Sequence, residues 1–142
     1  MKTFKGGAYA LIFLGLLVST GCATTQQHLL DSESNQLRLR SIQTRAFDTT
    51  DKDKTLRAII ATLQDLGFIV DKADATLGAV TATKLNRYAL RVTVTVGPRG
   101  QTQLIVRVNA QYELSPVDAP EPYQQFFSAL QKVMFMSAQE AD

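Results

Sequence analysis

Apolar side chains recur every three or four residues shortly after residue 50, which is the pattern of a helix with one buried face. Thr50 or Asp51 can cap the start of this helix, because either side chain can accept a backbone N–H of the first turn. Gly67 follows the last apolar position, where a helix end favours a residue that adopts positive φ. The sequence therefore predicts one amphipathic helix between these ends. Its stripe consists of Leu56, Ile59, Ile60, Leu63 and Leu66.

A second helical stripe follows the proline-rich loop at residues 115–122. Pro122 suits the first turn of a helix, where its missing N–H leaves no hydrogen bond unmade. The apolar face of this last helix is broad and comprises Tyr123, Phe126, Phe127, Leu130, Val133 and Met134. Core packing explains most of this face. The runs Phe126-Phe127 and Met134-Phe135-Met136 are more apolar than one buried stripe requires, so a protein-contact patch is the alternative.

Between the two helices, apolar and polar residues alternate, which is the pattern of strands with one buried face. Residues 88–96 and 104–113 form the two longest runs, and the even positions from Leu104 to Tyr112 are expected to be buried. Gly97 to Gly100 predicts a four-residue hairpin loop between them. Shorter strands are expected in the second half of residues 37–47, at 68–73 and at 79–84.

The element order is therefore β-α-β-β-β-β-α. Strands with a single apolar face and two amphipathic helices predict an α+β fold. We expect a two-layer sandwich in which an antiparallel sheet carries both helices on one face. Residues 37–142 are expected to form this single domain.

The N-terminal residues have the three parts of a signal peptide. Lys2 and Lys5 form a positive start, and residues 6–18 are uncharged. At about 1.5 Å per residue this uncharged stretch covers roughly 20 Å, which is short of a hydrocarbon core of about 30 Å. We therefore expect residues 1–21 to be a signal peptide that is removed.

The segment Val18-Ser19-Thr20-Gly21-Cys22 resembles the lipobox of bacterial lipoproteins. The resemblance implies cleavage between Gly21 and Cys22, a diacylglyceryl group on the Cys22 thiol and an acyl chain, such as palmitate, on the new amine. Ser19 departs from the pattern, since an aliphatic residue is commoner there. Ala23, in place of Asp, implies an outer-membrane anchor with the domain in the periplasm. The alternative is ordinary secretory cleavage beside an incidental cysteine.

The residues after the cysteine are polar and without sustained periodicity. We expect residues 22–36 to be a lipidated cysteine followed by a flexible tether. Two of the 15 basic residues, Lys2 and Lys5, lie in the segment expected to be removed. The part after cleavage therefore has equal numbers of basic and acidic residues, 13 of each. A neutral domain gives no electrostatic reason to bind nucleic acid.

Groups that carry catalysis are scarce. The chain has one cysteine and one histidine, His28, so a Ser-His pair in the folded part, an intramolecular disulfide and a thiolate metal cluster are excluded. The remaining candidates are carboxylates at turns and helix ends, where capping explains them: Asp48, Asp51, Asp53, Asp71 and Asp74. We expect no enzyme, no metal and no cofactor beyond the lipid.

Polar side chains on the outward face of the two long strands are the candidate protein-docking face. The predicted face contains Arg87, Arg91, Thr93, Arg107 and Asn109, with Thr95 and Gln111 beside them. Arg87 and Arg91 share one strand face, and Arg107 is expected close to them across the hairpin. The alternatives are a merely solvated face and an exposed strand edge that pairs with a partner.

Residues 44–84 resemble small uncharacterised lipoproteins of Gram-negative bacteria. The strand–helix–strand unit with "LQDLGF" is also loosely similar to one domain of the lipoprotein of the β-barrel assembly machine. These resemblances imply the fold and supply no catalytic residues. We expect a lipid-anchored, non-enzymatic binding subunit of an envelope assembly or export system. The alternatives are a carrier or sensor of a small hydrophobic ligand and, third, a cell-wall enzyme.

Overall fold

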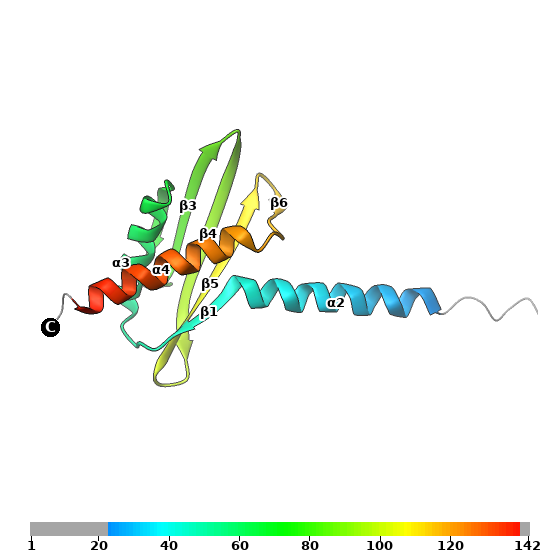
Figure 1. Ribbon diagram of the computed structural model, residues 1–142, viewed down its shortest axis with the longest axis horizontal. Helices are drawn as coiled ribbons and strands as arrows, with labels where there is room; N and C mark the ends of the chain where they lie inside the picture. Colours follow the sequence, from blue (N-terminus) through cyan, green and yellow to red (C-terminus); the bar gives the residue numbers. More distant parts are fainter. Residues whose placement is uncertain (1–22, 140–142) are drawn as a thin grey trace, which may run out of the picture. The chain divides into compact units, whose positions relative to one another are not determined.

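The computed structural model describes the backbone of residues 23–139 and the side chains of residues 33–136. The predicted signal peptide and its cleavage and lipidation at Gly21 and Cys22 lie outside the described residues. The chain divides into two units, residues 1–37 and 38–142. The second unit contains the whole sheet and both predicted helices (Figure 1).

The sheet is antiparallel, with strand order β1-β5-β4-β3-β2 and β6 beside β5. Its strands are β1 (Thr44–Phe47), β2 (Ile69–Asp74), β3 (Ala79–Asn86), β4 (Tyr88–Arg99), β5 (Gln103–Tyr112) and β6 (Ser115–Pro116). The helices α3 (Lys52–Asp65) and α4 (Glu121–Gln139) lie on one face of it (Figure 1). The predicted α+β fold class is confirmed. The edge strand β2 has a register irregularity between Val70 and Lys72.

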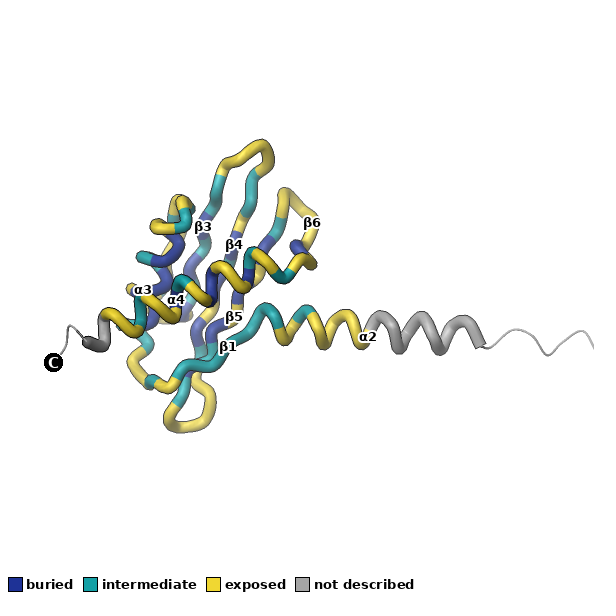
Figure 2. The backbone as a smooth tube through the Cα atoms, in the orientation of Figure 1, coloured by how far each residue is buried: buried dark blue, intermediate teal, exposed yellow. Residues whose placement is uncertain are grey.

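The core lies between the sheet and the two helices, as the dark tube segments of Figure 2 show. Successive residues of a strand point to opposite faces, so alternate positions of β3, β4 and β5 reach the helices. The fully buried large side chains include Ile59, Leu63, Val80, Val94, Val106, Val108, Tyr123, Phe127 and Leu130. Every buried side-chain nitrogen or oxygen in the described part has a hydrogen-bond partner.

The ends of α3 are set by the residues that the sequence singles out. Asp51 has an extended backbone, and its side chain accepts the N–H of Lys54 at 2.8 Å, which makes it the N-cap. Gly67 has φ +80°, and its N–H donates to the carbonyl of Gln64 at 2.9 Å. The predicted cap and the predicted positive-φ glycine are therefore confirmed.

The prediction of an unstructured tether is wrong in its secondary structure, because Ala23–Gln43 forms the helix α2. This segment contains no glycine or proline, and most of its residues are good helix formers, including Ala23, Leu29, Gln36 and Arg40. The apolar residues of this segment do not line up as one stripe, and helix prediction from periodicity depends on such a stripe.

Two further predictions about the long hairpin are wrong. β4 continues through Gly97 and Pro98, which pair with Ile105 and Leu104, so the turn lies at residues 100–102. Gly100 takes φ +64° there. Tyr112 is 45% exposed, because the helices do not reach this end of the sheet.

Tyr123 links the end of α2 to the body of the domain. Its buried hydroxyl donates to the carbonyl of Val117 at 2.7 Å and accepts the side-chain amide of Gln43 at 3.2 Å. The N–H of Val117 in turn donates to Ala110 of β5 at 2.9 Å. The bond from Val117 to Ala110 lies on β5 between the residues that pair with β1 and those that pair with β6.

Candidate functional site

The face of the sheet opposite the helices, here called the open face, is polar. It is formed by the outward residues of β3, β4 and β5, which include Thr81, Thr83, Arg91, Thr93, Thr95, Arg107, Asn109 and Gln111. These residues stand in rows across neighbouring strands. Their hydroxyl and amide groups both donate and accept hydrogen bonds, and the guanidinium groups of the arginines donate them.

Four of the five predicted docking residues share the open face. Thr93 pairs directly with Asn109, and Arg107 pairs with the neighbouring Thr95. Arg91 pairs with Gln111, which lies four residues from Arg107 along β5. At about 3.4 Å per residue the two arginines are therefore roughly 14 Å apart along the strand. The prediction that Arg107 lies close to Arg91 is wrong.

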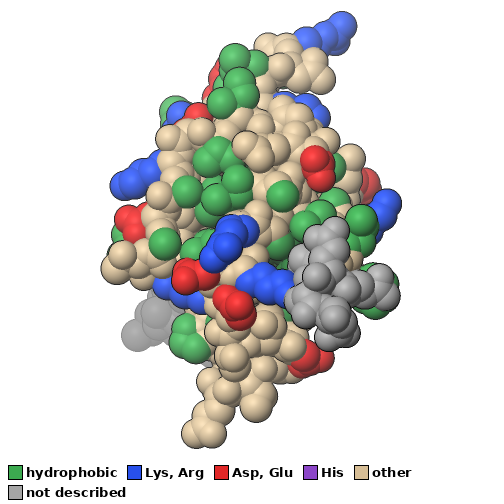
Figure 3. All heavy atoms as spheres, turned by 90° about the vertical axis from the view of Figure 1, so that its left-hand side faces the viewer, with side chains coloured by type: hydrophobic (Ala, Val, Ile, Leu, Met, Phe, Trp, Pro, Cys, Tyr) green, Lys and Arg blue, Asp and Glu red, His purple; other side chains and the backbone are tan. Residues whose placement is uncertain are grey.

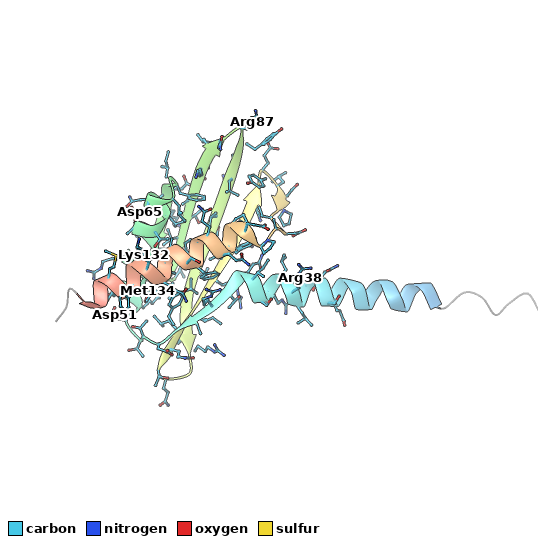
Figure 4. All side chains as sticks on the ribbon, viewed as in Figure 1. Arg38, Asp51, Asp65, Arg87, Lys132 and Met134 are labelled. Carbon is cyan, nitrogen blue, oxygen red and sulfur yellow. The ribbon has the colours of Figure 1, made fainter. Side chains whose placement is uncertain are left out.

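Arg87 does not belong to the open face. It forms the turn between β3 and β4 with φ +52°, and Figure 4 shows it at the tip of that hairpin. Its side chain is exposed. Because a residue at the turn is outside the strand alternation, the assumption that Arg87 and Arg91 share one strand face is wrong.

The β2 margin of the open face has a shallow hollow of about 310 Å³ that the sequence analysis missed. Its apolar members Ile69 and Leu85 are exposed, and the Thr83 hydroxyl donates to Asp71 at 2.7 Å. The signal available in the sequence was Ile69, an apolar residue at a position that faces away from the helices. The open face therefore combines polar rows with an apolar margin.

The five carboxylates do not converge. Asp51 caps α3, Asp74 accepts the N–H of Leu77 at 2.9 Å in a turn, and Asp71 accepts the Thr83 hydroxyl. Asp48 accepts the side-chain amide of Gln103, and Asp53 lies in the first turn of α3. The capping and turn interpretation is confirmed for Asp51 and Asp74. Within the described part of the chain, no three His, Cys, Asp or Glu side chains gather closely enough to hold a metal ion.

Charges of both signs are mixed on the side of the molecule shown in Figure 3. Blue and red side chains alternate there with apolar ones, which agrees with the equal numbers of basic and acidic residues that follow Cys22. Among the helices in residues 23–139, none combines the length and the apolar character needed to cross a membrane.

A second concave surface, here called the apolar groove, lies on the helix side of the sheet and has a volume of about 230 Å³. Its floor comes from β4 and β5 and its walls from the end of α3 and the start of α4. The principal lining residues are Leu63, Leu66, Phe68, Lys84, Tyr88, Leu90, Tyr112, Pro122 and Phe126. The exposed apolar residues Phe135 and Met136 of α4 lie outside this lining.

Lys84 is the charged residue of the apolar groove. Its ammonium group donates to the carbonyl of Leu66, the C-cap of α3, at 2.8 Å, and lies 5.7 Å from the centre of the Phe68 ring. A cation suits this position, because the carbonyls at a helix C-terminus carry partial negative charge. Lys84 therefore joins β3 to the end of α3.

Replacing Lys84 by Met is expected to lower the free energy of unfolding by about 1–2 kcal/mol. Met keeps an apolar stem of similar length but removes the charged hydrogen bond and the cation–π contact. Urea denaturation of the chain carrying Cys22→Ala, followed by circular dichroism, measures the change. Lys132→Met on the exposed side of α4 is the control and should stay within about 0.5 kcal/mol. Equal losses in both variants would contradict the role of Lys84.

No protein-family model matches the sequence, and no curated protein matches it significantly. The functional proposal below therefore rests on the chain's own sequence pattern, fold and surfaces.

Proposed function

We propose that the chain is a lipid-anchored, non-enzymatic binding subunit of the bacterial envelope, which docks a partner protein of an assembly or export system on its open face. The observation that carries this proposal is the open face itself. It offers rows of threonine, asparagine, glutamine and arginine side chains over three adjacent strands. Within residues 38–142, the helices α3 and α4 lie on the opposite face of the sheet and leave the open face uncovered.

The composition of the open face favours a protein partner over a small molecule. Its polar groups are spread over a broad surface and do not surround a deep cavity, and its hollow at the β2 margin is shallow. Arginine is enriched at protein interfaces, and here Arg91 and Arg107 flank the central pair Thr93–Asn109. Such a surface supports docking with polar specificity.

The anchor is proposed from the lipobox-like segment, which ends at Cys22. A diacylglyceryl group together with an N-acyl chain gives stable membrane attachment, whereas a single chain is marginal. The outer membrane is proposed because Ala23, not Asp, follows the cysteine.

Replacing Cys22 by Ala is expected to move the protein from the membrane fraction to the soluble periplasmic fraction, since no thiol remains to carry the lipid. Cell fractionation followed by immunoblotting measures this distribution, and Cys22→Ala should leave the fold of residues 38–142 unchanged by circular dichroism. Membrane association that persists at wild-type level in the variant would refute the lipid anchor.

The docking proposal predicts that the double variant Thr93→Arg, Asn109→Arg loses its partner. Two bulky cations at the centre of an interface should weaken it at least about tenfold. The lipidated full-length protein is crosslinked in cells and purified in mild detergent, and the proteins that co-elute with it are quantified by mass spectrometry. Ser128→Arg, an exposed position on α4, is the matched control and should retain the partner. A wild-type protein that elutes alone would contradict the proposal.

A further inference from the structure

The helix layer stops short of one end of the sheet. Along β4, Val94 and Val92 are buried, Leu90 is half-buried, and Tyr88 is 65% exposed. All four residues face the helices, because they occupy alternate positions of one strand. Exposure also rises along β5, from the buried Ala110 to Tyr112, which is 45% exposed. The helix-side face of the sheet is therefore apolar and uncovered towards the β3–β4 turn.

The apolar groove begins where this cover ends, and its size argues against an enclosed small molecule. Its volume of about 230 Å³ lies below the roughly 300–1,000 Å³ of sites that enclose drug-sized ligands. An occupant would place a few apolar groups in the groove and leave most of its surface outside. Tyr88 and Tyr112 on the rim add contact area beyond the groove. This combination fits a protein segment that inserts a few apolar side chains.

The charge that lines the apolar groove indicates which kind of protein segment would bind there. Lys84 is the one charged side chain among the residues that line it. An ammonium group has three N–H donors, and one of them donates to the Leu66 carbonyl. The cation therefore has donors left for a carboxylate, and no carboxylate lines the groove. The complement is an apolar segment that carries an acidic residue.

A helix is the conformation that fits this position. The layer already consists of helices packed on a sheet, and the groove lies between the end of α3 and the start of α4. We propose that the apolar groove binds an acidic amphipathic helix of a partner protein, which completes the helix layer. This site is independent of the open face and lies on the opposite side of the sheet, so one chain would hold two protein segments at once.

The test uses the full chain reconstituted in phosphatidylcholine nanodiscs as bait for a phage-displayed library of random peptides about 15 residues long, roughly four helical turns. Phage that bind empty nanodiscs are removed first. The expected consensus has apolar residues spaced three and four apart with Asp or Glu beside them. Fluorescence anisotropy with the synthetic consensus peptide then gives affinities. A selection that yields no such consensus overturns the proposal.

The variants locate the binding site. Tyr88→Glu and Tyr112→Glu should each weaken peptide binding at least about tenfold, because an anionic side chain replaces apolar contact area on the rim. Leu114→Glu is the matched control: Leu114 is 93% exposed and does not line the groove, so binding should be unchanged. Replacing the acidic residue of the peptide should cost about two- to fivefold against the wild type and nothing against Lys84→Gln.

Other occupants give different results. Quenching of Tyr88 and Tyr112 fluorescence by brominated lipids would show that the rim lies in the membrane, and this would overturn the proposal. A dimer that dissociates on Tyr112→Glu would identify a second copy as the occupant and would overturn it as well. The variant Thr93→Arg, Asn109→Arg should leave peptide binding unchanged, so failure of the groove and failure of the open face are distinguishable.

Discussion

Replacing Phe127 by Ala is expected to lower the free energy of unfolding by about 3–5 kcal/mol, a large part of the roughly 5–15 kcal/mol of a typical domain. Phe127 is 1% exposed, and its ring meets that of Phe126 edge to face, with centroids 5.4 Å apart. The Arg45 guanidinium lies 5.0 Å from the Phe127 ring centre. Alanine would remove these contacts and leave a cavity between α4 and the sheet. Urea denaturation of the chain carrying Cys22→Ala measures the change.

Phe135→Ala provides the matched control for this prediction. Phe135 lies on the same helix and is 65% exposed, so its loss should change stability by no more than about 0.5 kcal/mol. The comparison separates burial from helix propensity, because both substitutions introduce the same residue into α4. A loss of similar size at both positions would mean that α4 does not pack on the sheet as described.

Replacing Gly78 by Ala is expected to cost about 2–5 kcal/mol. Gly78 has φ +70°, a conformation that costs an L-residue roughly 1–2 kcal/mol. A Cβ atom would also lie 2.6 Å from the backbone oxygen of Val96 and 2.6 Å from Cε of Lys52. Lys52 can move, but the Val96 oxygen belongs to β4, so the turn must shift at a further cost of about 1–3 kcal/mol. Two backbone hydrogen bonds of Gly78, to Asp74 and from Val96, would be strained with it.

Gly100→Ala separates the cost of the backbone conformation from the steric cost at Gly78. Gly100 has φ +64°, but a Cβ atom there would meet nothing within 4 Å. The control should therefore lose only the roughly 1–2 kcal/mol of the backbone conformation. Thermal or urea denaturation of the two variants measures the difference, and equal losses would disprove the close approach of Val96 to Gly78.

The elements with strong local signals were predictable from sequence. Asp51 and Gly67 mark the ends of α3, since capping and positive φ depend on residues within one turn. The alternation in β4 and β5 predicts which side chains face the helices. What alternation does not reveal is how far the helices extend, and for this reason Tyr112 was wrongly predicted to be buried.

The error in the hairpin register was avoidable. A loop at Gly97–Gly100 would pair Val96 with Gln101, which opposes an inward residue to an outward one. The alternation of both strands requires an odd number of loop residues, as in the observed turn at 100–102, which pairs Val96 with Val106. The same shift moves Arg107 away from Arg91. Register, more than composition, therefore determined the layout of the open face.

The apolar groove was beyond sequence analysis, because it depends on where α3 ends relative to the start of α4. Its lining comes from segments separated by up to about sixty residues, such as Leu63 and Phe126. The sequence contained one local sign of the groove, because the charged residue Lys84 occupies a position of β3 that faces the helices. Its partner, the Leu66 carbonyl, could be identified only from the structure.

The edge strands of the sheet affect the tendency of the protein to aggregate. The β2 edge carries Asp71, Lys72 and Asp74 and breaks its register at Val70, and the opposite edge has only the four-residue β1 and the two-residue β6. Charged, irregular and short edges oppose the strand-by-strand growth of aggregates. A chain proposed to be concentrated on a membrane surface meets its own copies often. Its edges would keep these encounters from becoming fibrils, while the open face and the apolar groove stay free to bind other proteins.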